Sequence, residues 1–212
     1  MRTQGFNAVA VRRLTGITYR QLDYWDTTGL VRPSVRGAAG KGSRRVYSFQ
    51  DVLEVRVISR LRALGVPLPA IRKAVRYLAR HFEAVTRPLA QLTLVAEGRS
   101  ILVKHEQRLI DATAGGQVVV AVPVAAIADE LQKNVIELAA PREITFKLRG
   151  RTVRAVLTPD LEAGGFTVEV PELPGVITEA DTIGEARRMA RDAAALWLDA
   201  RALPSGRSRT AR

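Results

Sequence analysis

The sequence predicts a multidomain α+β protein with a helical N-terminal unit, a small mixed middle domain and a C-terminal antiparallel sheet with one packed helix. Three observations predict this order. Apolar residues at helical spacing fill the first third of the 212 residues, short strand-like runs follow, and alternating apolar residues then precede a capped helix. With 47% hydrophobic residues, the chain can build more than one core.

The positive charge lies in the N-terminal third. Residues 1–80 hold 16 Lys/Arg and 4 Asp/Glu, whereas residues 81–212 hold 17 of each sign, and the whole chain has a net charge of +12. An excess confined to one compact segment is typical of a surface that binds a phosphate backbone. The charge distribution therefore favours nucleic acid over an acidic membrane face.

The stretch VAVRRLTGITYRQLDYW predicts two short helices joined at Gly16. The first is expected to bury Val9 and Leu14. A Thr-x-x-Gln capping box starts the second helix at Thr18, and Gly29 supplies the left-handed residue that ends it. In this helix Leu22 and Trp25 are expected to face the core.

A basic hairpin is expected next. The segment 27–50 has no acidic residue, and its GAAGKGS run lies between two short β-compatible pieces. Its basic residues are Arg32, Arg36, Lys41, Arg44 and Arg45. Two further helices follow, one capped by Ser48 and ended by Gly65, the other with apolar residues at Leu68, Ile71, Val75, Leu78 and Phe82.

The middle segment predicts strands at 91–98, 99–105 and 117–122, and then a helix that opens at Pro123. The uncharged run 112–128 is too short for a membrane span of about 20 residues and contains two glycines, a glutamine and a proline. We therefore expect a buried strand and a helix there. The N-terminus has no signal peptide pattern, so we expect a cytoplasmic protein.

The last segment predicts strands at 143–150, 151–158 and 164–171. Thr182 and Glu185 then form a capping box for a helix that runs to about Trp197. The tail is expected to be disordered. The predicted organisation is a DNA-binding domain at 1–82, a small α+β domain at 88–140, a second α+β domain at 143–202 and a tail at 203–212.

Residue types that carry catalysis are sparse. The sequence has no cysteine, which excludes disulfides, thiolate metal sites and cysteine nucleophiles. His81 and His105 are far apart and each follows a basic residue, so we expect surface side chains. GAAGKGS lacks the Gly-Lys-Ser/Thr run of a phosphate loop, and Glu169 and Glu172 have no partner acid. We expect no enzyme activity, no metal and no cofactor.

A helix, a tight turn, a second helix and a basic hairpin are the order of a winged helix-turn-helix. The residues ITYRQLDYWDTTGLVRPSVR and GSRRVYSFQDVLEVRVISRLRALGVPLPAIRKAV, within 6–80, resemble the MerR family of bacterial transcription regulators. The resemblance implies that the helix after Thr18 is the recognition helix, that Tyr24 contacts phosphate and that the wing bears a basic pair. The DNA-binding residues expected are Thr18, Tyr19, Arg20, Tyr24, Arg36, Lys41, Arg44, Arg45 and Tyr47.

The chain departs from the common family pattern at two positions. Asp23 stands where the family has an arginine, and Pro67 stands where it has a cap residue. Asp23 could accept from a cytosine amino group or orient Arg20, so base preference does not carry over from the family. The cysteines that metal-sensing members carry after the long dimerisation helix are absent, which excludes that kind of sensing.

Two further resemblances cover the rest of the chain. The segment LAQLTLVAEGRSILVKHEQRLIDATAGGQVVVAVPVAAIADEL is similar to the domain that follows the DNA-binding unit in an actinobacterial branch of MerR-type regulators, which implies dimerisation or effector sensing. GGFTVEVPELPGVITEADTIGEARRMARDAAALWL resembles a HicB-type antitoxin domain. In that family the domain sequesters a small RNA-cleaving toxin and usually precedes its DNA-binding domain. The order is reversed here.

The sequence therefore predicts a cytoplasmic, homodimeric regulator that binds double-stranded DNA at an inverted-repeat promoter site. The MerR resemblance further implies promoter control by distortion of the DNA between two half-sites. The alternative is an antitoxin that binds a small RNA-cleaving toxin, or another protein, through its C-terminal domain and autoregulates its operon.

Overall fold

The structure is a computed structural model that describes residues 5–37, 44–81, 93–97, 100–105, 108–111 and 120–202, with no side-chain detail for 93–122. Lys41, Phe82, the GGQ run, the tail at 203–212 and the side chains of His81 and His105 lie outside this description. The chain divides into two compact units, Met1–Ile136 and Glu137–Arg212. The division falls inside a helix. Among the described helices, none has both the length and the apolar character needed to cross a membrane.

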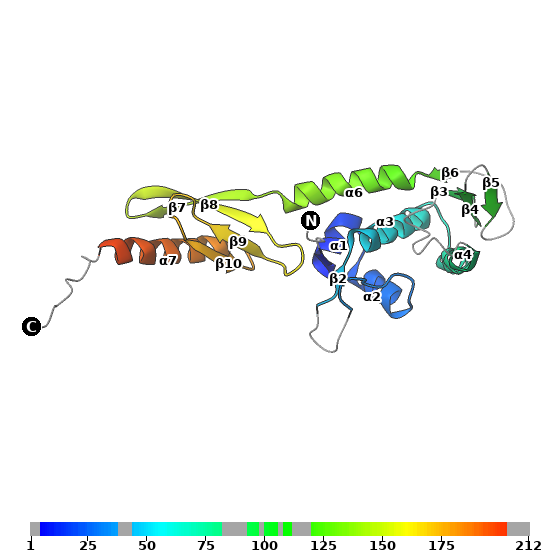
Figure 1. The fold of residues 1–212 in the computed structure, drawn as a ribbon, viewed down its shortest axis with the longest axis horizontal. Coiled ribbons are helices and arrows are strands. Elements are labelled where there is room, and N and C mark those ends of the chain that lie inside the picture. The colour runs from blue at the N-terminus through cyan, green and yellow to red at the C-terminus, as the bar shows by residue number, and fades with distance from the viewer. Residues whose placement is uncertain are drawn as a thin grey trace, which may run out of the picture. The chain divides into compact units, whose positions relative to one another are not determined.

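The first unit begins with four helices, which run from blue to green in Figure 1. They are α1 (Ala8–Thr15), α2 (Tyr19–Thr27), α3 (Phe49–Ala63) and α4 (Leu68–His81). Two short strands, β1 (Phe6–Asn7) and β2 (Val46–Tyr47), pair antiparallel beside α1 and α3. The predicted helical character of the N-terminal region is confirmed.

Local sequence signals set the ends of α1. The Asn7 side chain accepts hydrogen bonds from the backbone N–H groups of Val9 and Ala10, and Gly16 ends the helix with φ of 74°. Leu14 is buried as expected, but Val9 is 55% exposed. The prediction for Val9 is wrong because a spacing of five residues places it on the opposite side of the helix from Leu14.

The helices α3 and α4 pack their apolar faces into one core. Ser48 caps α3 as predicted, and Gly65 follows its end with φ of 87°. Fully or almost fully buried side chains include Val52, Leu53, Val57, Leu61, Ile71 and Leu78. This core gives α2 and β2 a fixed support.

The base of the predicted basic hairpin is described, but its tip is not. Val46 exchanges backbone hydrogen bonds with Arg36, at 2.9 and 3.0 Å, and also pairs with Asn7 of β1. No sequence pattern indicated β1, whose two residues join β2 from about 40 positions away. Arg36 and Val46, at the two ends of the segment 36–46, are therefore neighbours.

The rest of the first unit is a four-stranded antiparallel sheet followed by a long helix. The strands are β3 (Thr93–Glu97), β4 (Ser100–His105), β5 (Arg108–Asp111) and β6 (Val120–Val122), in the order β5-β4-β3-β6, and the helix is α6 (Val124–Ala139). The strand β5 was not predicted. One face of α6 buries Val124, Ile127, Leu131 and Val135, and Arg56 of α3 forms an ion pair of 2.7 Å with Glu130.

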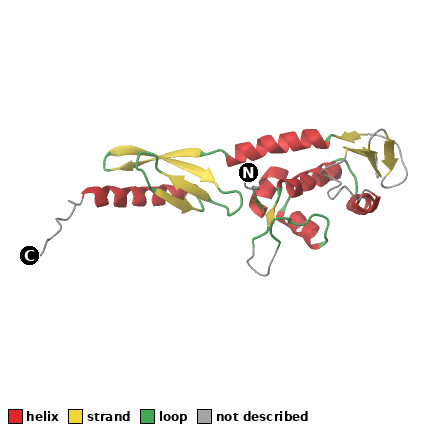
Figure 2. Ribbon diagram, in the orientation of Figure 1, coloured by secondary structure: helices red, strands yellow, loops and turns green. Residues whose placement is uncertain are grey.

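The second unit is an antiparallel sheet with one helix along it, as Figure 2 shows in yellow and red. Its elements are β7 (Arg142–Leu148), β8 (Arg151–Pro159), β9 (Phe166–Glu169), β10 (Ile177–Ala180) and α7 (Ile183–Ala202), with strand order β10-β9-β8-β7. Ala186, Ala190 and Ala194 are fully buried, so α7 packs through its smallest side chains. The predicted sheet-and-helix architecture is confirmed.

Candidate nucleic-acid interface

The helix α2 starts at a complete capping box. The Gln21 N–H donates to Thr18 Oγ1 at 3.2 Å, and the Thr18 N–H donates to Gln21 Oε1 at 2.8 Å. Leu22 and Trp25 are buried, as predicted from their spacing. A helix capped at its start and anchored on one side presents its other side in a fixed orientation.

The other side of α2 carries the residues expected to face DNA. Tyr19 and Tyr24 are each 52% exposed, and Arg20 is exposed between them. Thr18 is exposed as well, although its hydroxyl already serves as the cap. Thr18, Tyr19, Arg20 and Tyr24 are thus all exposed, with the two tyrosines on opposite flanks of the surface on which Arg20 lies.

Arg45, which directly precedes β2, contacts α2 through both terminal nitrogens of its guanidinium group. Its Nη1 lies 2.9 Å from Asp26 Oδ2 and 3.0 Å from Asp23 Oδ1, and its Nη2 donates to the Tyr19 hydroxyl at 3.0 Å. The same guanidinium lies over the Tyr19 ring. Burial alone would lower the pKa of Arg45, but the hydrogen bond to Asp26 and the neighbouring charges raise it overall.

This geometry reassigns Arg45. We expected its side chain to contact phosphate from the hairpin, but only 9% of it is exposed, and Nη1 and Nη2 both donate to α2. The sequence did not reveal the pairing because Asp23 and Asp26 lie about 20 positions earlier in the chain. Arg45 fastens the base of the hairpin to α2.

Tyr47 also requires a correction. Its side chain has no exposed surface, and its hydroxyl has no hydrogen-bond partner among the described residues. Burial raises the pKa of Tyr47 to about 12, although the nearby Arg45 charge opposes part of this shift. A side chain without exposed surface cannot contact DNA in this conformation, so Tyr47 belongs to the core.

A buried carboxylate holds the start of the hairpin against α3. Asp51 Oδ2 accepts from the Ser34 N–H at 2.8 Å, the Ser34 hydroxyl at 2.7 Å and the Ser48 N–H at 2.8 Å. Arg36 and Arg44, expected to contact DNA, are both exposed above this anchor. The Ser-x-x-Asp spacing at Ser48 is a capping signal that could have identified Asp51.

Arg72 of α4 holds the other end of α2, a contact that no sequence pattern indicated. Its guanidinium donates to the Thr28 carbonyl oxygen at 3.0 Å and hydrogen-bonds the Thr28 hydroxyl. The guanidinium carbon lies 5.6 Å from the centre of the Tyr24 ring. Each exposed tyrosine of α2 therefore lies beneath an arginine from another element.

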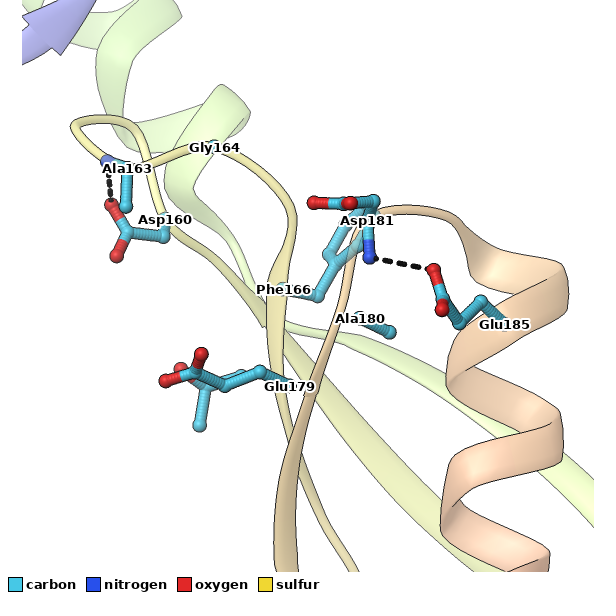
Figure 3. A pocket seen from close by; sticks show the side chains of 9 residues that line it. Asp160, Ala163, Gly164, Phe166, Glu179, Ala180, Asp181 and Glu185 are labelled. Atoms are coloured by element: carbon cyan, nitrogen blue, oxygen red, sulfur yellow. Dashed lines mark hydrogen bonds between the residues drawn. The ribbon is translucent and has the colours of Figure 1, made fainter. Parts of the chain in front are cut away.

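The second unit contains a polar hollow of about 260 Å³, shown in Figure 3. Four carboxylates contribute to its lining, from Asp160, Glu179, Asp181 and Glu185. Asp160 accepts from the backbone N–H of Ala163 at 2.7 Å, and Glu185 accepts from that of Asp181 at 3.1 Å. Within the described part of the chain, no three His, Asp or Glu side chains are arranged to hold a metal ion.

Two family models match the chain. Residues 6–78 match the MerR HTH family regulatory proteins, and residues 154–209 match the HicB-like antitoxins of bacterial toxin-antitoxin systems. The first match covers α1 to α4 and the hairpin. The second covers β8 to α7.

Curated relatives match half of the chain or slightly more. An uncharacterised HTH-type transcriptional regulator of Mycobacterium tuberculosis and one of Mycobacterium bovis are each 39% identical over 128 residues, which is 60% of this chain and 56% of the relative. The nodulation protein NolA of Bradyrhizobium elkanii is 33% identical over 115 residues, 51% of this chain and 47% of that protein. The chain thus spans about half the length of these relatives. It carries a MerR-family helix-turn-helix domain at its N-terminus and a HicB-like antitoxin domain at its C-terminus.

Proposed function

We propose that the protein is a sequence-specific DNA-binding transcriptional regulator that acts as a homodimer on an inverted-repeat promoter site. The observation that carries the proposal is the outward face of α2, where Tyr19, Arg20 and Tyr24 stand exposed on a capped helix in the most basic part of the chain. The MerR-family match and the names of the mycobacterial relatives support regulation rather than enzyme activity.

In this proposal α2 enters the major groove. Residues at its N-terminal end reach base edges. The Tyr24 hydroxyl donates a hydrogen bond to a phosphate oxygen and adds no positive charge. The segment 36–45 acts as the wing, and Arg36, Lys41 and Arg44 neutralise the adjacent backbone. Arg45, at the end of this segment, is joined to α2 through Asp26, and Ser34, just before its start, is joined to Asp51 of α3.

The dimer is proposed from the geometry of helix-turn-helix recognition. One α2 helix reads only a few base pairs, and two-fold related helices read two half-sites about one helical turn apart. The residues that follow the DNA-binding domain, including α6 and the β3 to β6 sheet, are available to join two copies. We therefore expect binding stoichiometry of two chains per duplex.

Selection of bound duplexes from a random DNA pool tests this function. The full chain should enrich an inverted repeat, and the isolated complex should contain two chains by light scattering. A variant with Arg20→Ala and Arg44→Ala should enrich nothing above background, while Arg151→Ala, a charge change on the exposed start of β8, should enrich the same repeat. Recovery of unrelated sequences by the unchanged protein would contradict the proposal.

A second candidate function is that of an antitoxin. It is favoured by the HicB-like match and by the acidic hollow of the second unit, because four carboxylates around one depression would attract a small basic protein. DNA binding would then be autoregulatory. In this case the full chain should co-purify with the product of a neighbouring small open reading frame and abolish its RNA cleavage, and the pair Glu179→Gln with Asp181→Asn should weaken that complex.

A further inference from the structure

Asp23 places a carboxylate on the outward face of α2, one helical turn from Tyr19. Its side chain is 49% exposed. A negative charge at this position repels the phosphates that Arg20 attracts. If α2 lies against DNA, the carboxylate therefore needs a hydrogen-bond donor from the DNA itself.

Arg45 pairs with only one of the two oxygens of the Asp23 carboxylate. Asp23 Oδ1 lies 3.0 Å from Arg45 Nη1, which also contacts Asp26 Oδ2 at 2.9 Å. One cation thus faces two carboxylates, and the cluster keeps a formal charge of −1. The other oxygen, Asp23 Oδ2, has no hydrogen bond within the described part of the chain. Asp26, whose side chain is 17% exposed, is the inner partner, and Asp23 is the outer one.

We propose that Asp23 is a specificity-determining residue that accepts a hydrogen bond from the N4 amino group of a cytosine in each half-site, with Arg45 as its positioning residue. This inference rests on the proposed DNA-binding function. In the major groove guanine and thymine present acceptors, which repel a carboxylate. Adenine presents its amino donor beside the N7 acceptor, whereas cytosine presents a donor alone.

Arg45 positions Asp23 by restricting its rotation. The guanidinium is nine-tenths buried and is itself fixed by Asp26 and the Tyr19 hydroxyl, so its ion pair with Asp23 Oδ1 restrains the Asp23 carboxylate. A fixed acceptor loses little conformational freedom on binding, which favours discrimination between bases. If the Asp23–Arg45 ion pair serves only to hold the hairpin, substitution of Asp23 should not change the base preference.

The selection experiment separates these readings when it includes variants of Asp23. The unchanged protein should enrich cytosine at one position of each half-site, on the order of ten-fold over the other bases. Asp23→Ala should lose that preference alone. Asp23→Asn should shift it to adenine, because an amide can donate to N7 and accept from the N6 amino group. Asp129→Asn, which removes a charge from the exposed side of α6, should keep the cytosine.

Arg45→Lys tests the positioning role. The variant keeps the positive charge but cannot bridge Asp23, Asp26 and Tyr19 at once, so the cytosine preference should fall while circular dichroism shows a folded chain. An undiminished preference would overturn the role of Arg45. Equal loss of affinity for every sequence in both Asp23 variants would overturn the role of Asp23. Failure of the unchanged protein to enrich any duplex would instead overturn the proposed function.

Discussion

The guanidinium carbon of Arg72 lies 5.6 Å from the centre of the Tyr24 ring, and the same group donates to the Thr28 carbonyl oxygen at 3.0 Å. These contacts join α4 to the C-terminal end of α2. Together with Arg45, which holds the other exposed tyrosine, they fix the helix from two sides.

We predict that Arg72→Ala weakens DNA binding several-fold although Arg72 is not a proposed DNA contact. The loss of the Thr28 hydrogen bonds and of the ring contact lets the C-terminal end of α2 move. DNA binding must then order this end, which costs conformational entropy and lowers the affinity. Fluorescence anisotropy with the selected duplex measures the effect. Arg76→Ala, an exposed position one turn along α4, is the control and should bind normally. Equal affinities for the two variants would show that Arg72 does not restrain α2.

Asp51→Ala should lower the free energy of unfolding of the N-terminal domain by about 2 kcal/mol, because it removes the buried, charged acceptor of the Ser34 and Ser48 hydrogen bonds. Urea unfolding followed by Trp25 fluorescence, in a Trp197→Phe background, measures this change. Glu137→Ala, on the exposed side of α6, should cost less than about 0.5 kcal/mol. A similar cost for both variants would contradict the anchoring role.

Tyr47→Phe should leave DNA binding unchanged, because the hydroxyl is buried and lacks a partner among the described residues. The substitution should also change stability at high pH. Folding raises the pKa of Tyr47 to about 12, so the folded state favours the neutral hydroxyl. The resulting contribution to the free energy of unfolding is complete below about pH 10 and is lost as the pH rises toward 12. Urea midpoints of both proteins across this range should show the unchanged protein losing stability faster than Tyr47→Phe. Parallel curves would contradict the burial of the hydroxyl.

Local signals in the sequence predicted the ends of the helices but not the contacts between distant segments. Thr18 with Gln21 and Ser48 with its helix act over three residues, so spacing alone revealed them. The two-residue strand β1 and the pair of Arg45 with Asp26 depend on packing across many positions, which no periodicity encodes. Tyr47 was expected to contact DNA because the MerR resemblance puts it at the end of the wing, whereas β2 turns its side chain into the core.

The second unit offers a test of close packing at Gly165. A Cβ at this glycine, whose φ is +76°, would lie 2.6 Å from the Ala180 carbonyl oxygen on β10. Gly165→Ala should therefore lower the free energy of unfolding of this unit by at least about 2 kcal/mol. Gly175→Ala has a φ of +88° but meets no atom within 4 Å, so it should cost about 1 kcal/mol. Amide hydrogen exchange of α7 measures both, and equal protection in the two variants would contradict the predicted clash.

The salt dependence of DNA affinity tests the central claim that the outward face of α2 binds DNA. Dissociation constants of the unchanged protein, Arg20→Ala and Arg151→Ala are measured with the selected duplex from low to physiological salt. We predict that Arg20→Ala binds on the order of ten-fold more weakly with a shallower salt slope, while Arg151→Ala matches the unchanged protein. Identical affinity and slope for Arg20→Ala and the unchanged protein would contradict it.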